Sequence, residues 1–366
     1  MNVQRPWFPN LNGIRSVACL MVFAAHGWDY LNNRSSMHPA ESWIYQHFIN
    51  GLGTTGVCLF FVLSGFLITR LLIHEKEQTG SISLKQFYLR RVLRIWPVFF
   101  VVTAAGFFVV PLLTGTFSSS ATAQHLPWYL FFANNFDRLF TGFTGFGNDS
   151  LGVLWSIAVE EQFYLLWPLV VLLVNRKWFP LVPLLAVAGS VVFRYFHAGQ
   201  TEVITFHTLS VMGDLAMGSL LAWYTFYHPR QYSPVARAGR YAFFLAVIAI
   251  HQPLLHAPDF TVFGRTLLTL GFVFLIEDQV IYETGVFRFS SARLLSRFGV
   301  VTYGVYCYHL FVIMLMQKLN VKMGWDTIGT GVFVIELLSV FMITLGLAVL
   351  SYRVMEKRLL GLGSGR

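Results

Sequence analysis

Charged residues are scarce in this chain of 366 residues. Asp, Glu, Lys and Arg make up 12% of it, hydrophobic residues make up 55%, and the mean hydropathy is +0.60. A soluble globular chain carries about 25% charged residues, so this sequence has too few charges to cover the surface of a globule. The composition excludes a disordered chain and a cytosolic enzyme, and it indicates a protein whose solvent is largely lipid.

Cysteine is also rare. Cys19, Cys58 and Cys307 are the only three, each lies in an apolar segment, and no two form a Cys-x-x-Cys pair. Such cysteines are typical of small buried hydrophobic residues. We expect neither disulfides nor a metal site.

Acidic residues are the minority among the charges. There are 17 Asp and Glu against 26 Lys and Arg, for a net charge of +9. In a soluble protein this surplus would favour nucleic acid as a partner. In a chain this apolar it favours cytoplasmic loops that face anionic lipid, so the expected partners include membrane lipids and no nucleic acid.

Long hydrophobic runs occupy most of the chain. A helix needs about 20 apolar residues to cross the hydrocarbon core. The predicted spans are 14–31, 52–73, 95–113, 153–174, 178–196, 205–227, 239–252, 260–281, 299–317 and 327–351. The run after Arg15 lacks a small-residue cleavage site, so we interpret it as a span and not as a signal peptide. We expect an all-α polytopic membrane protein with one transmembrane domain over 1–366 and no appended soluble domain.

The basic residues predict how the chain is oriented. With the N-terminus inside, 20 of the 26 Lys and Arg fall at inner ends of the spans, which predicts that both termini are cytoplasmic. The outer side keeps Arg34, Arg138, Arg194, Arg265, Lys318 and Lys322. The polar segment 114–126 is expected to be an outer loop, and 127–150 to be an interfacial or re-entrant stretch.

Ionisable residues inside the predicted spans are the candidate functional groups, because each costs about 2.5–3.5 kcal/mol at the bilayer centre. His26 follows Arg15 by eleven residues, a rise of about 16 Å on a helix. His309, Glu160 and Asp214 also lie well inside spans. We expect them to face the interior of the helix bundle.

These residues suit acid–base chemistry. A neutral His can take the proton of a hydroxyl, and a carboxylate such as Glu160 can orient its ring. Tyr164 follows Glu160 by four residues and shares its helix face. A single His in a helix is more often a packing residue, so His309 stays open between a packing and a catalytic or substrate role. Asp214 stays open between a substrate contact and a structural hydrogen-bond partner.

A basic cluster lies between the second and third predicted spans. Arg90, Arg91 and Arg94 are three and four residues apart, so on a helix they share a face. Guanidinium groups are suited to phosphate oxygens, although anchoring to lipid headgroups is the ordinary alternative. A basic site at the inner surface, with His26 about half a bilayer above it, fits a donor with a phosphorylated head and a long thin reactive arm.

The chain resembles the acyltransferase-3 family of integral-membrane O-acyltransferases over nearly its whole length. The family's Arg-x10-His motif is present as Arg15 and His26, within LNGIRSVACLMVFAAH. The other matching segments are GVCLFFVLSGFLITRLL with Ser64, FYLRRVLRIWP with Arg91 and Arg94, LWSIAVEEQFYLLWP with Ser156, Glu160, Phe163 and Tyr164, TYGVYCYH ending at His309, and, more weakly, MGDLAMGSLLA around Asp214 and Gly218. Asn12 stands where relatives often have Asp.

The resemblance implies transfer of an acyl group, commonly acetyl, from cytoplasmic acyl-CoA to a hydroxyl of a sugar, glycolipid or glycosylated small molecule. His26 and Glu160 are then the expected catalytic residues. Acyl-CoA, as a co-substrate and not a permanently bound cofactor, is expected to contact Arg15, Arg90, Arg91 and Arg94. The expected substrate or oxyanion contacts are Tyr164, His309, Asp214 and Ser64, and the expected location is the bacterial inner membrane.

Two other classes of function stay open on the sequence. A proton-coupled transporter would use the same buried His and Glu as a relay, but the chain shows no matching halves with broken helices. A non-catalytic lipid-binding or sugar-binding protein would neither transfer nor hydrolyse acyl groups. The sequence does not dictate the acceptor, the length of the acyl group, or whether transfer is direct or passes through an acyl-enzyme.

Overall fold

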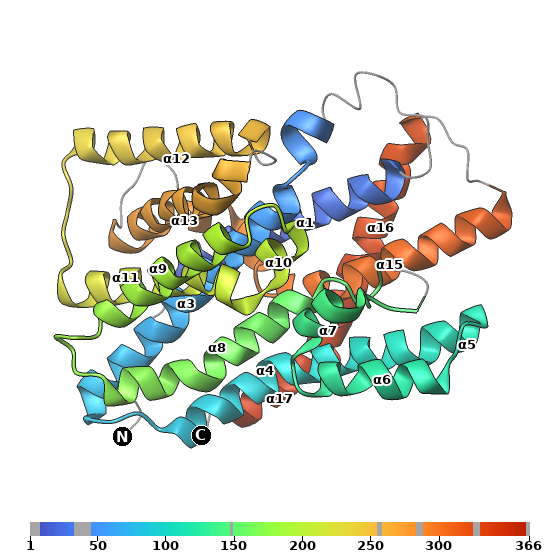
Figure 1. Cartoon of the computed structure of the whole chain (residues 1–366), viewed down its shortest axis with the longest axis horizontal. Coiled ribbons are helices and arrows are strands. Elements are labelled where there is room, and N and C mark those ends of the chain that lie inside the picture. The colour runs from blue at the N-terminus through green and yellow to red at the C-terminus, as the bar shows by residue number, and fades with distance from the viewer. Residues whose placement is uncertain are drawn as a thin grey trace. The chain divides into compact units, whose positions relative to one another are not determined.

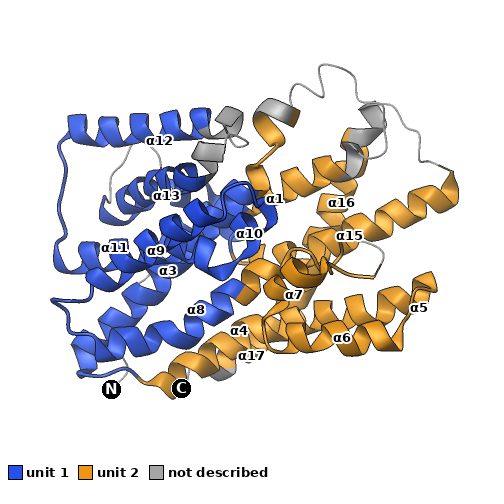
Figure 2. Ribbon diagram, in the orientation of Figure 1, with its two compact units in different colours: residues 1–18, 54–82, 159–299 blue, residues 19–53, 83–158, 300–366 orange. Residues whose placement is uncertain are grey.

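The computed structural model describes residues 8–32, 45–146, 149–254, 258–282, 288–324 and 330–363, and these residues form helices joined by turns, with no strand among them (Figure 1). They divide into two compact units, which are described separately below (Figure 2). Arg5, Arg34 and Arg366, which entered the count of basic residues, and the start of the predicted span 327–351 lie outside the described residues.

Unit 1 comprises residues 1–18, 54–82 and 159–299. It holds the first part of α1 (Pro9–Asn32), most of α3 (Leu52–Thr79) and α8 (Leu154–Leu173), and then α9 (Leu181–Phe196), α10 (Thr201–Phe206), α11 (Thr208–Tyr227), α12 (Pro234–Leu254), α13 (Pro258–Ile281), η3 (Phe289–Ser291) and α14 (Arg293–Phe298). Its core is a cluster of buried apolar side chains from α1, α3, α11, α12 and α13, including Ile14, Val62 and Phe272.

Two glycines let α3 and α11 approach closely within unit 1. A Cβ placed on Gly65 would lie 1.9 Å from the backbone oxygen of Leu215, and one placed on Gly218 would lie 1.9 Å from that of Val62. Small residues at such crossings give the backbone contact that drives helix association in membranes. Ser219 adds a hydrogen bond from its hydroxyl to the Gly65 carbonyl, at 3.3 Å.

Unit 2 comprises residues 19–53, 83–158 and 300–366. It holds the remainder of α1, η1 (Tyr45–Ile49), α4 (Leu84–Ala104), η2 (Ala105–Val109), α5 (Val110–Thr114), α6 (Ser119–Leu130), α7 (Asn134–Thr141), the start of α8, α15 (Thr302–Met323), α16 (Thr330–Ser351), η4 (Tyr352–Glu356) and α17 (Lys357–Gly363). Within it, α15 packs against α16 and α4, and α17 against α4.

In unit 2 the chain doubles back after α5. Helices α4, η2 and α5 form one continuous run, Leu84–Thr114, and α6 returns beside its end (Figure 1). The ring of Tyr129, near the end of α6, contacts Phe107 of η2 at 5.1 Å between centroids, and Phe132 contacts Phe99 of α4 at 4.5 Å. Because Phe107 lies seven residues before Thr114, α6 ends about 10 Å or more back along the long helix.

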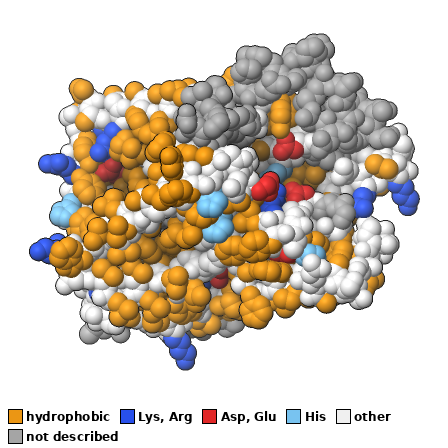
Figure 3. Space-filling model, in the orientation of Figure 1, with side chains coloured by type: hydrophobic (Ala, Val, Ile, Leu, Met, Phe, Trp, Pro, Cys, Tyr) orange, Lys and Arg blue, Asp and Glu red, His pale blue; other side chains and the backbone are white. Residues whose placement is uncertain are grey.

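Five of the described helical runs are long and apolar enough to cross a membrane. They are Leu52–Thr79, Leu84–Thr114, Leu154–Leu173, Thr201–Tyr227 and Val334–Gly361. Leu166 and Leu173 of α8 are 63% and 78% exposed, as expected of side chains that meet lipid. Hydrophobic side chains gather on the left and lower parts of the face drawn in Figure 3. The other five predicted spans correspond to helices α1, α9, α12, α13 and α15, so ten crossings and cytoplasmic termini stay predictions.

One expectation about a polar segment was wrong. Residues 114–126 are not an outer loop throughout, because α6 begins at Ser119 and the Ser118 hydroxyl caps it by accepting from the Ala121 amide at 3.2 Å. Arg194, in the last turn of α9, and Arg265, on α13, are buried, and their assignment to the outer side stays a prediction. They are 2% and 7% exposed inside unit 1, because carbonyl, hydroxyl and carboxylate oxygens satisfy their guanidinium groups there.

Candidate active site

A pair of histidines lies inside unit 2. Nδ1 of His26, on α1, is 2.9 Å from Nε2 of His309, on α15, and the two rings are stacked with centroids 5.1 Å apart. Nδ1 of His309 is 2.7 Å from the backbone oxygen of Tyr306, one helical turn earlier. The His309 side chain is buried, at 1% exposure. The structure therefore brings together the two histidines that the sequence singled out.

This chain of hydrogen bonds assigns the proton positions on both rings. The Tyr306 carbonyl only accepts, so Nδ1 of His309 carries the hydrogen. Nε2 of neutral His309 is then an acceptor, and Nδ1 of His26 must donate to it. It follows that Nε2 of His26 holds the lone pair. That nitrogen is the basic and nucleophilic atom of the site.

Other contacts in unit 2 fix the helix that carries His309. The hydroxyls of Tyr306 and Ser156 are 2.6 Å apart, and the Tyr306 hydroxyl also donates to the Val153 carbonyl at 3.2 Å. The Tyr303 hydroxyl donates to the Ile95 carbonyl of α4 at 2.6 Å. The positive charge of Arg138, on α7, acts on the His26 imidazole. The histidine pair is thus held by α4, α8 and α15, and it has a guanidinium nearby.

The predicted basic cluster lies on α4, in the same unit. Arg90, Arg91 and Arg94 are half-buried in the first part of the helix. The Arg91 guanidinium lies 5.9 Å from the centre of the Phe87 ring, and the charge of Arg94 acts on the Glu356 carboxylate. Since the same helix runs on to Thr114, the cluster marks one end of a span of 31 residues.

Glu160 lies in unit 1 with two of its predicted neighbours. The Ser64 hydroxyl donates to its Oε1 at 2.7 Å, and the Tyr164 hydroxyl donates to its Oε2 at 3.0 Å. The expectation that Glu160 and Tyr164 share a helix face is confirmed. Assistance of His26 by Glu160 stays a prediction.

Arg15 also has a partner within unit 1. Its Nη1 donates to Oδ1 of Asn12, one turn earlier on α1, at 3.2 Å. An amide oxygen at this position therefore still orients the guanidinium, but it supplies no negative charge. The role of Arg15 as a contact for acyl-CoA stays a prediction.

Asp214 forms a buried ion pair in unit 1. Its Oδ2 accepts from Nε and Nη2 of Arg265 at 2.8 and 2.6 Å, and its Oδ1 accepts from the Thr269 hydroxyl at 2.8 Å. The exposed fraction of Asp214 is 2%. Because both carboxylate oxygens are occupied by partners of the same unit, we interpret Asp214 as a structural residue that ties α11 to α13.

Comparison with known proteins identifies the family. The model of a family described as an acyltransferase domain matches residues 8–353. The chain belongs to the acyltransferase-3 family. It is similar to the peptidoglycan O-acetyltransferase OatA of Listeria monocytogenes, with 30% identity over 85% of this chain and 50% of that protein. It is also similar to the O-acetyltransferase OatA of Staphylococcus aureus, with 27% identity over 96% of this chain and 57% of that protein.

This acyltransferase-3 chain spans about half the length of the curated relatives it matches. No solved structure matches it. Within the described residues, no group of three or more His, Cys, Asp or Glu side chains is arranged to hold a metal ion.

A further candidate group in unit 2, a histidine paired with a carboxylate, was not predicted from the sequence. Nδ1 of His125, on α6, lies 3.0 and 3.1 Å from the two carboxylate oxygens of Asp137, on α7. The Thr141 hydroxyl donates to Oδ1 of Asp137 at 3.0 Å. Two features of the sequence could have predicted the helix that carries His125: Ser118 is a favourable N-cap residue, and helix-compatible residues follow it.

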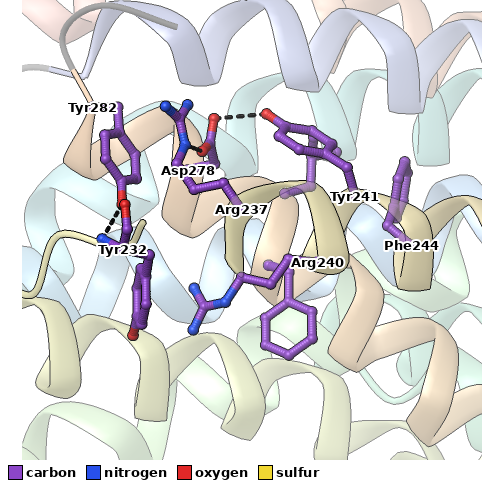
Figure 4. A pocket seen from close by; sticks show the side chains of 9 residues that line it. Tyr232, Arg237, Arg240, Tyr241, Phe244, Asp278 and Tyr282 are labelled. Atoms are coloured by element: carbon purple, nitrogen blue, oxygen red, sulfur yellow. Dashed lines mark hydrogen bonds and ion pairs between the residues drawn. The ribbon is translucent and has the colours of Figure 1, made fainter. Parts of the chain in front are cut away.

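A pocket in unit 1 carries paired arginines (Figure 4). The Arg237 guanidinium lies 3.8 Å from the centre of the Tyr282 ring and donates to Asp278 at 2.8 Å. Arg240 lies 3.5 Å from the centre of the Tyr232 ring and forms an ion pair with Glu277. Partial burial, together with hydrogen bonding, raises the pKa of Tyr232 to about 12. Since each guanidinium has its own carboxylate, we interpret this pocket as a link between α12 and α13.

Proposed function

We propose that this protein is a membrane O-acyltransferase that moves an acyl group, acetyl in the first instance, from acyl-CoA to a hydroxyl of a carbohydrate or glycosylated acceptor. Membership of the acyltransferase-3 family supports acyl transfer, and relatives named O-acetyltransferases support acetyl as the group. The single structural observation that carries the proposal is the 2.9 Å bond between His26 and His309. The proposed location is the bacterial inner membrane.

The reactive atom in this proposal is Nε2 of His26. It takes the proton of the acceptor hydroxyl, or it attacks the thioester carbonyl itself. In either route His26 gains positive charge, and its Nδ1–H then forms a charge-assisted hydrogen bond to neutral His309. As a neutral orienting partner, His309 adds no buried charge of its own beside His26.

The donor in this proposal is acyl-CoA, whose phosphates would bind the arginines of α4. Arg90, Arg91 and Arg94 offer guanidinium forks at one end of the Leu84–Thr114 helix. The thin pantetheine arm would then extend into the membrane toward His26. Arg15 is proposed as a further contact for acyl-CoA, and Glu160 as a carboxylate that assists His26.

The acceptor in this proposal is a sugar hydroxyl. The name of the Listeria relative gives peptidoglycan as that protein's acceptor, so a soluble muropeptide is the first probe. Purified protein in lipid nanodiscs would be incubated with radiolabelled acetyl-CoA and this muropeptide. We expect an alkali-labile acetyl ester on the sugar. Vesicle counterflow of the muropeptide without acetyl-CoA, and no ester, would instead favour a transporter.

A further inference from the structure

His125 and Asp137 form a buried dyad in unit 2 that the reaction described above does not use. Asp137 is fully buried, and the His125 side chain is 10% exposed. Nδ1 of His125 is within hydrogen-bond distance of both carboxylate oxygens, at 3.0 and 3.1 Å. The His125 ring stacks on Phe143 with centroids 3.9 Å apart and planes 3° apart. The ring therefore has a fixed position and orientation.

The dyad leaves one nitrogen available for chemistry. A carboxylate only accepts, so Nδ1 of His125 carries the hydrogen and Nε2 holds the lone pair. Among the described residues, Nε2 makes no hydrogen bond. The contact of Nδ1 with Asp137 is enough to join α6 to α7, so that structural role does not use Nε2. A carboxylate that also steadies the charged ring makes Nε2 a competent general base.

The position of the dyad suits an acceptor. Helix α6 begins just after the end of the long helix that lies opposite the arginine cluster. It runs back beside that helix, so that Phe132, which precedes α7, meets Phe99. Phe143, on which His125 stacks, contacts Phe107 near that end. Oδ1 of Asn134, on α7, is buried and has no hydrogen-bond partner within the described part of the chain. A hydroxyl group of the acceptor would donate a hydrogen bond to this oxygen.

The same short helix connects the dyad with the histidine pair. Arg138 follows Asp137 on α7, and its charge acts on the His26 imidazole. One helix of eight residues therefore carries both the group that orients His125 and a cation near His26.

We propose that His125, oriented by Asp137, is the general base that takes the proton of the acceptor hydroxyl, while His26 carries the acyl group. This inference rests on the proposed function, and it assigns the acceptor side of the reaction to α6 and α7. Asp137 is a positioning residue, because it acts through His125.

The two histidines then divide the reaction into two steps. In the first, Nε2 of His26 forms a bond to the thioester carbon, the carbon–sulfur bond breaks, and CoA leaves as the thiolate. In the second, the acceptor oxygen attacks the acyl carbon of the acyl-imidazolium while its proton passes to Nε2 of His125, directly or through one water. The carbon–nitrogen bond breaks, and its electron pair returns to His26. His125 then releases the proton to solvent, and one proton from solvent neutralises the thiolate.

Stopped-flow measurement of CoA release tests this division without knowledge of the natural acceptor. Acetyl-CoA is mixed with the protein in nanodiscs, and a thiol reagent reports CoA, because the protein's own three cysteines are buried. Water serves as the acceptor. We expect a first turnover of about one CoA per protein, followed by slower steady hydrolysis.

The variants His125→Gln and Asp137→Asn separate the two steps. We expect the first turnover to keep its rate within about twofold, and steady hydrolysis to fall by about 10²-fold or more for His125→Gln, as is typical of a lost general base. For Asp137→Asn we expect a fall of at least about tenfold, because the ring loses the carboxylate that stabilises its charged form. Retention of the first turnover also shows that each variant is folded.

A matched control is His197→Gln. His197 also stacks on a phenylalanine, Phe193, but its Nδ1 is bonded to a backbone carbonyl and not to a carboxylate. We expect it to leave both phases unchanged. Steady hydrolysis at the wild-type rate in His125→Gln, or equal slowing of both phases, would overturn the assignment. Wild-type protein that releases no CoA would contradict the proposed function itself.

Discussion

Nδ1 of His26 donates to Nε2 of His309 across 2.9 Å, and His309 is fixed in turn by the Tyr306 carbonyl. The hydrogen-bond chain ends on a backbone oxygen, so the proton arrangement is set without any charged group. The consequence is that Nε2 of His26 is the lone-pair nitrogen.

Replacement of His309 separates its role as an acceptor from its bulk. In His309→Gln the amide oxygen can still accept from His26, whereas His309→Leu leaves the His26 Nδ1–H without its partner. We expect kcat for acetyl transfer to fall by about tenfold in the first variant and by about 10²-fold or more in the second. The measurement is steady-state kinetics with acetyl-CoA. Equal kcat in the two variants would mean that His309 only fills space.

Removal of Arg91 and Arg94 tests the donor site. We expect Arg91→Ala/Arg94→Ala to raise the Kd for acetyl-CoA by about tenfold or more, because charge-assisted bonds to phosphate are lost. Calorimetric titration in nanodiscs measures this, and the affinity of the wild-type protein should fall with added salt. The control is Lys177→Ala, whose ammonium lies against Trp178 in unit 1. Unchanged affinity in the double variant would assign the two arginines to lipid headgroups.

Asp214→Asn should destabilise the protein without acting on the chemistry. It leaves the buried Arg265 guanidinium with an uncompensated charge, which costs about 3–5 kcal/mol. Thermal unfolding in detergent should show a lower midpoint, while the KM for acetyl-CoA of the folded fraction stays within about twofold. The double variant Asp214→Leu/Arg265→Met, which removes both charges, should recover part of the loss. A wild-type midpoint for Asp214→Asn would contradict the structural interpretation.

Gly218→Ala should also destabilise the protein, because its Cβ would lie 1.9 Å from the Val62 carbonyl oxygen and force α3 from α11. Gly189→Ala on α9 is the matched control, since nothing lies within 4 Å of its added Cβ. We expect Gly189→Ala to raise the free energy of unfolding by about 0.5–1 kcal/mol, because alanine has a higher helix propensity than glycine. Thermal unfolding of the two variants measures the difference. Equal midpoints would refute the close crossing.

The sequence predicted the parts of the site that follow from spacing along single helices. Glu160 and Tyr164 are four residues apart, so their hydrogen bond was readable from helix periodicity. His26 and His309 were both expected inside the bundle. Their pairing joins residues 283 apart along the chain, however, and no local pattern specifies such a contact.

Other features needed tertiary structure. From the sequence, Arg265 was assigned to the outer end of a span. Its ion pair with Asp214, 51 residues away, follows only from the tertiary structure. The dyad of His125 and Asp137 lies in a stretch whose mixed polar and aromatic composition obscures helix periodicity.

The central claim is that His26 is the group that reacts with the acyl donor. The most direct test compares wild-type protein with His26→Gln for two quantities, the Kd for acetyl-CoA and the rate of CoA release in the first turnover. We predict that the Kd stays within about threefold while the first-turnover rate falls by about 10²- to 10⁴-fold. A first turnover at the wild-type rate in folded His26→Gln would contradict the account.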